Sequence, residues 1–330
     1  MRIFIMEYFL SKKKNCDFKE SFYKEGKEIL DSLIKSFLKI KEHQLSILIN
    51  RDNLDLIDHQ SDRISFILTA EDSKLSYFEK LSKLEIDSSD YFLIVAPETN
   101  NLLYQITKIM EDKNIKNLGC SSNCIKKAAN KWLLYQQFKN TPVLLPETYL
   151  INSAEVELKK DFFPAVIKAK YSAGSELKIV KSKKEFNNLK LEDYNGQIIQ
   201  KVIDGIPGSL SIAANSKEFK ILSINKQLIN TDDFSYLGSI INHKFQGDYK
   251  LQELANLIKN KFPCLNGYFG IDFIYTQKGF YLLEINPRIT SSFIGLAAIS
   301  NPAEIITKPT MKKNWGPDQQ TKKEFTFKLD

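Results

Sequence analysis

The sequence is poor in arginine, histidine, glycine and proline, and each shortage excludes a class of protein. Only four of its 47 basic residues are arginine, so the chain lacks the arginine forks that a nucleic-acid reader uses, although its net charge is +7. The sequence has only three histidines, which are widely spaced, so a His-rich zinc site or a Ser-His-Asp hydrolase is not expected. With 13 glycines and 10 prolines in 330 residues, the chain is neither collagen-like nor of low complexity. We therefore expect a globular protein with no nucleic-acid partner.

Long hydrophobic runs are also missing. No apolar run approaches the roughly 20 residues that a membrane helix needs. The apolar stretch at the N-terminus ends at Glu7, which is too short for a signal peptide. We therefore expect a cytoplasmic protein with no membrane partner. Four cysteines form no disulfide framework in a chain of this length, and we assign Cys120 and Cys124 to packing at the start of a helix.

The first 118 residues alternate short apolar runs with amphipathic helices, which predicts a parallel sheet. Strands are expected at 3–8, 44–49, 64–68 and 91–96, and helices at 24–40 and about 102–110. Ligands of such sheets bind at the carboxyl ends of the strands. Glu98 follows one of these ends and is a pocket candidate, with an ordinary surface loop as the alternative.

From residue 119 the pattern changes to short strands with few helices between them. A helix is expected from about 121 to 138 and another at 251–262. Strands are expected at 143–150, 163–168, 177–180, 197–203, 210–214 and 221–224. The fold class is therefore α/β, with an α+β C-terminal part. We predict three units, residues 1–118, 119–198 and 199–330, and leave the tail from 301 unassigned.

The strongest chemical signal lies in residues 267–288, where two strands flank a turn. If the connection is the three-residue loop 277–279, counting outward places Asp272 opposite Glu284. Because side chains alternate between the faces of a strand, Asn286 then shares the face of Glu284. A register slip of one residue would separate these faces.

Two carboxylates and an amide oxygen are a hard, oxygen-only ligand set that suits Mg²⁺ shared with phosphates. Arg288, two residues beyond Asn286, can fork onto a phosphoryl oxygen. The alternative is a surface hairpin with exposed acids, in which two carboxylates about 5 Å apart would repel by roughly 3 kcal/mol at an effective dielectric near 20. We favour the metal site.

Three segments upstream are weaker signals. Lys168 lies in a nearly apolar strand, where a buried ammonium needs an anionic partner. The small-residue turn at 171–175 allows backbone N–H groups to approach a phosphate. The apolar strand at 196–205 ends at a turn whose backbone groups could bind an adenine edge, although such a stretch is more often part of a core.

In this order the segments resemble the ATP-grasp superfamily of carboxylate–amine ligases, over roughly residues 119–298. The shared order is a lysine helix, a lysine strand, a small-residue loop, a hinge strand, an Asp strand and a Glu-x-Asn-Pro-Arg strand. Segments at 5–8, 23–27, 95–98, 117–122, 130–131 and 225–227 narrow the resemblance to members that join L-glutamate to tyramine in methanofuran-type cofactor biosynthesis.

The resemblance implies an N-terminal parallel-sheet pre-ATP-grasp domain, a small ATP-lid subdomain and a C-terminal antiparallel-sheet domain. It implies ATP and Mg²⁺, or Mn²⁺, as cofactors of an ADP-forming ligase. The substrates would be L-glutamate, activated at its γ-carboxylate, and tyramine or a related amine. Two alternatives stay open: a ligase with other substrates, and a non-catalytic nucleotide-binding module. The oligomeric state is also open, with a homodimer among the options.

The resemblance also implies roles for single residues. The residues that would bind ATP are Lys131, Lys168, Ser172, Gly174, Ser175, Gln200, Lys201, Ile203 and Asp204. The metal ligands would be Asp272, Glu284 and Asn286, and the catalytic residues Arg288 and Lys168. The candidates for substrate binding are Glu7, Tyr8, Glu98, Lys226 and Arg288. Two positions depart from the family: Gln200 stands where Glu is common, and Pro207 stands at the usual ribose-binding acid, for which Asp204 could substitute.

Overall fold

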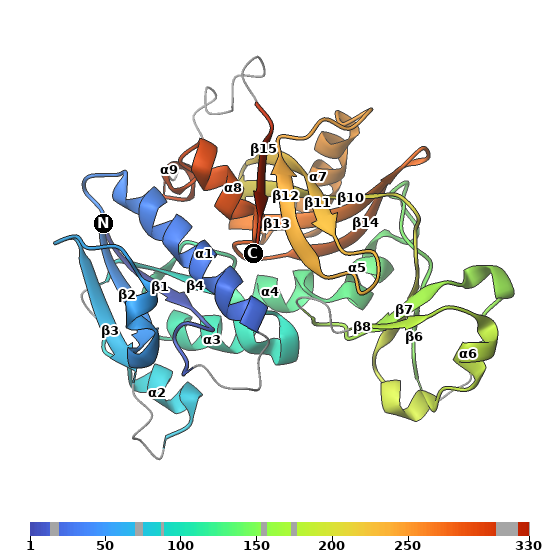
Figure 1. Ribbon diagram of the computed structural model, residues 1–330, viewed down its shortest axis with the longest axis horizontal. Coiled ribbons are helices and arrows are strands. Elements are labelled where there is room, and N and C mark those ends of the chain that lie inside the picture. Colours follow the sequence, from blue (N-terminus) through green and yellow to red (C-terminus); the bar gives the residue numbers. More distant parts are fainter. Residues whose placement is uncertain are drawn as a thin grey trace.

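The computed structural model describes residues 1–13, 20–69, 75–86, 89–152, 157–172, 177–307 and 323–329. Three sheets organise these residues, and Figure 1 shows the four-stranded one, with its helix α6, set apart from the other two. The fold is mixed α/β, with a parallel N-terminal sheet and antiparallel sheets in the rest, as the sequence predicts. Within the described ranges, no helix is long and apolar enough to cross a membrane.

The N-terminal sheet is parallel, with strand order β3-β2-β1-β4-β5. Its strands are β1 (Arg2–Glu7), β2 (Gln44–Asn50), β3 (Ile64–Thr69), β4 (Tyr91–Val95) and β5 (Lys116–Asn117), and its helices are α1 (Glu20–Leu38), α2 (Tyr77–Lys83) and α3 (Leu102–Glu111). Five consecutive residues of β1 are buried, because α1 packs on one face of the sheet and α3 on the other. The carboxyl ends of β1 and β4 lie side by side, with Glu7 opposite Val95.

The second sheet is antiparallel, with order β6-β9-β7-β8, and it encloses a small core of its own. Its elements are β6 (Thr148–Leu150), β7 (Ala165–Lys168), β8 (Leu177–Val180), α6 (Lys183–Asn187) and β9 (Ile198–Lys201). The predicted boundary at residue 198 cuts β9, which pairs with β6 and β7 rather than with the C-terminal sheet.

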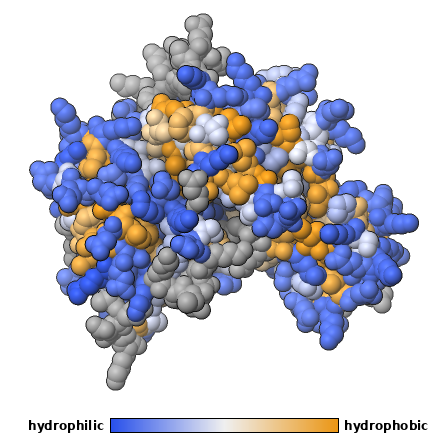
Figure 2. Space-filling model, viewed as in Figure 1, coloured by the Kyte–Doolittle hydropathy of each residue, from blue (hydrophilic) through white to orange (hydrophobic). Residues whose placement is uncertain are grey.

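The third sheet has order β14-β13-β10-β11-β12-β15. Its elements are β10 (Ile206–Ala214), β11 (Phe219–Ile229), β12 (Tyr236–Ile241), α7 (Lys250–Lys261), β13 (Gly267–Thr276), β14 (Gly279–Asn286), α8 (Ser292–Ile299), α9 (Ala303–Ile306) and β15 (Phe325–Lys328). Helix α8 lies between the sheet and α1 and so joins the N-terminal unit to this one. Figure 2 shows apolar side chains gathered near α8 on an otherwise mostly hydrophilic face.

The helix predicted from 121 to 138 is two helices, α4 (Ser122–Ala128) and α5 (Lys131–Phe138). Ser121 caps the first, and the side chain of Asn130 accepts a hydrogen bond from the N–H of Leu133 to cap the second. An asparagine cap inside an apolar helical pattern marks a break, and here it makes Lys131 the first residue of a new helix.

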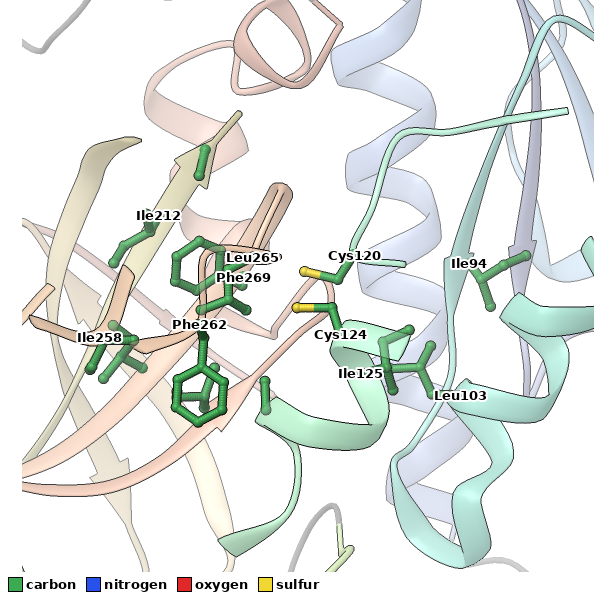
Figure 3. Packing of buried hydrophobic residues seen from close by; sticks show 14 of the residues in the cluster. Ile94, Leu103, Cys120, Cys124, Ile125, Ile212, Ile258, Phe262, Leu265 and Phe269 are labelled. Carbon is green, nitrogen blue, oxygen red and sulfur yellow. The ribbon is translucent and has the colours of Figure 1, made fainter. Parts of the chain in front are cut away.

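The assignment of Cys124 to packing alone is wrong, because Cys124 on α4 forms a disulfide with Cys264, with 5.4 Å between the Cα atoms. The buried Cys120 keeps its thiol and donates to the carbonyl oxygen of Asn266 at 3.0 Å. In Figure 3 the sulfur atoms of Cys120 and Cys124 point toward Leu265 and Phe269, in the apolar cluster that joins α4 to β13. A partner 140 residues away leaves no signal in the spacing of the cysteines.

Candidate active site

The hairpin of β13 and β14 brings Asp272 opposite Glu284, as predicted, but its loop and its register differ from the prediction. The connecting loop has two residues rather than three, since Thr276 pairs with Gly279. A bulge then leaves Leu283 without a partner between the pairs Phe273–Leu282 and Asp272–Glu284. The shorter loop and the extra residue cancel, so the two acids face each other.

Asn286 and Lys131 bind this pair of acids. The Asn286 amide donates to Oδ2 of Asp272 at 3.0 Å. The ammonium of Lys131 lies 3.0 Å from Oε2 of Glu284 and donates to the carbonyl oxygen of Ser172 at 2.8 Å. Lys131 is buried because α5 begins against the chain that follows β7, and its own N–H donates to the carbonyl oxygen of Lys170 at 3.0 Å.

The charges of this cluster separate the pKa values of its members. Burial and the neighbouring charge of Glu284 raise the pKa of Asp272 to about 8. Burial opposes ionisation of Glu284 as well, but the ammonium groups of Lys131 and Lys168 outweigh it and lower that pKa to about 2. Burial lowers the pKa of Lys168 to about 8, against the attraction of Glu284. The anionic partner expected for Lys168 is therefore Glu284.

The donor set fits a divalent cation. Asp272 and Glu284 lie close enough for a side-chain hydrogen bond, and the amide of Asn286 donates to Asp272. Carboxylate and amide oxygens are the ligands that Mg²⁺ and Mn²⁺ take in proteins. Because burial and the charge of Glu284 raise the pKa of Asp272, a cation bound between the two carboxylates would favour the ionised form of Asp272. Asp272, Glu284 and Asn286 are thus the residues suited to hold it.

A second buried ion pair joins the N-terminal sheet to the chain beyond β14. Nε of Arg288 lies 2.9 Å from Oε1 of Glu98, and Glu98 is only 3% exposed, so the surface-loop alternative for Glu98 is wrong. Oε2 of Glu98 has no hydrogen-bond partner among the described residues. A second guanidinium nitrogen of Arg288 donates to the carbonyl oxygen of Ile289 at 3.1 Å. This pair sets Arg288 at the carboxyl end of β4.

Glu7 and Tyr8 are both buried where β1 ends. Oε2 of Glu7 accepts the N–H of Leu10 at 2.8 Å. The ring of Tyr8 packs edge-on against Phe9 and Tyr77, with centroids 5.3 and 5.7 Å apart. Glu7 thus lies at the end of β1 beside the end of β4, which Glu98 follows, whereas Tyr8 belongs to an aromatic cluster with Phe9 and Tyr77.

The predicted adenine segment lies along β9 and the loop that follows it. Gln200 is buried and donates to Oγ1 of Thr148 at 2.9 Å, while the Lys201 side chain donates to the carbonyl oxygen of Asp161 at 2.7 Å. Ile203 is half-buried and Asp204 exposed in the loop between β9 and β10. The segment thus connects the small sheet to the C-terminal sheet, as a hinge would.

Lys226, another predicted residue, lies apart from the site. Lys226 follows Asn225, which pairs with Ser209 in the row of Asp272, so strand alternation puts Lys226 on the opposite face of the sheet. It is not part of the group around Glu284. Gly174 and Ser175 lie outside the described residues, whereas Ser172 contacts the site through its carbonyl oxygen.

A row of buried hydroxyl and amide groups beside the carboxylates was not predicted. The Asn225 amide donates to Ser209 and Ser211 at 3.2 Å, and Ser209 lies 3.3 Å from Ser292 at the start of α8. The serines at alternate positions of β10, inside an apolar strand, were the available signal. The contact between Glu25 of α1 and Ser291 was also missed, because the two residues are 266 positions apart.

Comparisons with known proteins agree with this geometry. A family model described as an ATP-grasp domain matches residues 128–292, and one described as a pre ATP-grasp 3 domain matches residues 50–125. The chain belongs to the ATP-grasp family and is an ATP-dependent carboxylate–amine ligase. Members of this family bind ATP, typically with Mg²⁺.

Single relatives are similar to this chain over most of its length. The chain is 34% identical to the tyramine–L-glutamate ligase of Methanocaldococcus jannaschii over 88% of this chain and 83% of that one. It is 32% identical to the enzyme of that name from Methanocaldococcus fervens, over 94% and 92%. A crystal structure of an ATP-grasp superfamily protein from Archaeoglobus fulgidus is 25% identical and superimposes with a TM-score of 0.67, over 93% and 87% of the two chains.

Proposed function

We propose that this ligase phosphorylates the γ-carboxylate of L-glutamate with ATP and joins the resulting acyl phosphate to tyramine. The products would be γ-glutamyltyramine, ADP and phosphate. The substrates are those in the names of the two curated relatives. The observation that carries the proposal is the cluster of Lys131, Lys168, Glu284, Asp272 and Asn286, buried or half-buried, which provides paired cations beside a metal-ligand set.

In the proposed mechanism, the chain positions and neutralises charge rather than forming a covalent intermediate. Lys131 and Lys168 would neutralise the phosphates of ATP, and Gln200 with the backbone after it would hold the adenine. A divalent ion on Asp272, Glu284 and Asn286 would shield the charge of the transferring phosphoryl group. Arg288, fixed by Glu98, would steady the acyl phosphate.

The substrates also fit the charge at the junction of β1, β4 and α1. An ammonium acceptor favours a site with more carboxylates than cations. Glu7 and Glu98 lie at the ends of neighbouring strands, Glu25 acts on Glu7 from α1, and Arg288 is the cation among the described residues that lowers the pKa of Glu7. We propose that the amine enters here, on the side of Arg288 away from the lysines.

An assay of ADP release tests the proposed function. With Mg²⁺, ATP and L-glutamate, we expect amine-dependent ADP formation with tyramine, and mass spectrometry should detect γ-glutamyltyramine. Alkylamines and amino acids serve as alternative acceptors, and L-aspartate as the alternative carboxylate. Turnover only with other substrates would indicate a different ligase of this family. ATP binding without amine-dependent phosphate release would indicate a non-catalytic nucleotide-binding module.

A further inference from the structure

Glu7 is held between the end of β1 and the first turns of α1. Its carboxyl group lies so close to Gly26 that a Cβ at position 26 would be 2.7 Å from its Cδ and Oε2 atoms. Gly26 is therefore a glycine because the carboxyl group occupies the place of a side chain. With the N–H of Leu10 bonded to Oε2, the carboxyl is fixed in one orientation and only 2% of Glu7 is exposed.

The neighbours of Glu7 leave its negative charge under-compensated. Glu25 on α1 repels this charge and Arg288 beyond β14 attracts it. The same charge of Glu7 contributes to raising the pKa of the Tyr77 phenol on α2. Arg288 is already paired with Glu98, whose second carboxylate oxygen is buried without a partner in the described part of the chain. Within the described residues the positive charge of Arg288 thus acts on two buried carboxylates, so the charge of the junction favours one further cation.

We propose that Glu7 is the general base that removes a proton from the ammonium of the acceptor amine. This inference rests on the proposed function, since it assigns a step in that reaction. An amine is bound as a cation but attacks as the neutral base, so a ligase for an ammonium substrate needs a proton acceptor near the acyl phosphate. Glu7 ends β1 opposite Val95 at the end of β4, where Glu98 holds Arg288, the residue assigned to that acyl phosphate. Glu25, the neighbour of Gly26, contacts Ser291 three residues beyond Arg288.

The step balances in atoms and charge. The carboxylate of Glu7 takes one proton from R–NH3⁺, which gives R–NH2 and the neutral acid. The nitrogen lone pair then forms the C–N bond, and the bond between the acyl carbon and the phosphate oxygen breaks. The second proton lost by the nitrogen leaves with the phosphate, and Glu7 returns its own proton to solvent before the next turnover.

The acidity of Glu7 suits this role. Burial, together with the charge of Glu25, raises its pKa to about 8, against the N–H of Leu10 and the charge of Arg288. A carboxylate of ordinary pKa would be too weak a base to accept a proton from an ammonium ion, whereas a base with a pKa near the working pH is efficient. The rate with an ammonium substrate should therefore rise with pH until Glu7 is ionised.

The test compares two acceptors in the wild type and in Glu7→Gln. Hydroxylamine is already neutral near neutral pH and needs no base to attack, so the γ-glutamyl hydroxamate reports acyl phosphate formation alone. We expect Glu7→Gln to lose about 100-fold or more in turnover with tyramine and to lose the rise of that rate with pH, while hydroxamate formation falls far less. Glu28→Gln, an exposed position on the same helix, is the matched control.

Every outcome decides the proposal. If the rates with tyramine and hydroxylamine fall equally, Glu7 has only a structural role. If turnover with tyramine is unchanged, Glu7 is not the base. If Glu7→Gln does not fold, Gly26→Ala tests the same point, because the new methyl displaces the carboxyl of Glu7 and should lower tyramine turnover more than hydroxamate formation. Wild-type enzyme that makes no hydroxamate from glutamate would instead contradict the proposed function itself.

Discussion

Replacing Glu284 with glutamine is expected to lower ligase turnover by about a thousandfold while the protein stays folded. The change removes the carboxylate that both lysines face and that completes the metal-ligand set. A metal ion contributes several kcal/mol of charge stabilisation in the transition state, and about 4 kcal/mol corresponds to a thousandfold in rate.

The fold should tolerate Glu284→Gln because Asp272 can replace the lost charge. Its pKa is raised to about 8 partly by Glu284, so removing that charge lowers the pKa and lets Asp272 ionise near Lys131 and Lys168. The measurements are ADP release, the thermal midpoint, and calorimetry of ATP binding with and without Mg²⁺. Retained turnover, or ATP binding with an unchanged Mg²⁺ requirement, would refute the assignment of Glu284.

Replacing Arg288 with methionine should cost both stability and activity. The change leaves Glu98 buried without its partner, and breaking a buried ion pair in this way costs about 3–5 kcal/mol of unfolding free energy. The double variant Glu98→Gln/Arg288→Met should regain most of that stability, because no unpaired charge remains. Its turnover should stay low, because the group assigned to the acyl phosphate is still missing.

Urea unfolding and ADP release separate these two effects. The matched control is Arg2→Met, since Arg2 pairs with Asp90 at 3.2 Å while both side chains are about half exposed. That exposed pair should contribute no more than about 1 kcal/mol. If the double variant is as active as the wild type, Arg288 has no role in the reaction. An Arg288→Met protein as stable as the Arg2→Met protein would show that Glu98 does not depend on its partner.

The sequence predicts the sheets well where the pattern is local. Four of the five strands of the parallel sheet, all but β5, and the hairpin around Asp272 and Glu284 follow from apolar runs and turn signals. The predicted turn is one residue longer than the observed one, and the bulge at Leu283 restores the pairing. A bulge leaves no mark in an apolar strand, so that agreement depended on two differences that cancel.

What the sequence could not predict is set by distant contacts. Strand β15, outside any prediction, completes the C-terminal sheet by pairing with β12, and Phe327 of β15 packs where a Cβ on Gly295 would clash. The disulfide of Cys124, the pairing of Glu98 with Arg288 and the contact of Gly26 with Glu7 likewise join segments far apart in the chain. Such contacts depend on tertiary packing, which single-sequence patterns do not encode.

The most direct measurement is a crystal structure with Mn²⁺ and a non-hydrolysable ATP analogue, read by anomalous scattering. We expect a manganese peak within about 2.2 Å of oxygen atoms of Glu284 and Asn286. Lys131 should then have exchanged its ion pair with Glu284 for a phosphate of the nucleotide. A manganese peak remote from both side chains, with the Lys131–Glu284 pair intact beneath a bound nucleotide, would contradict the account.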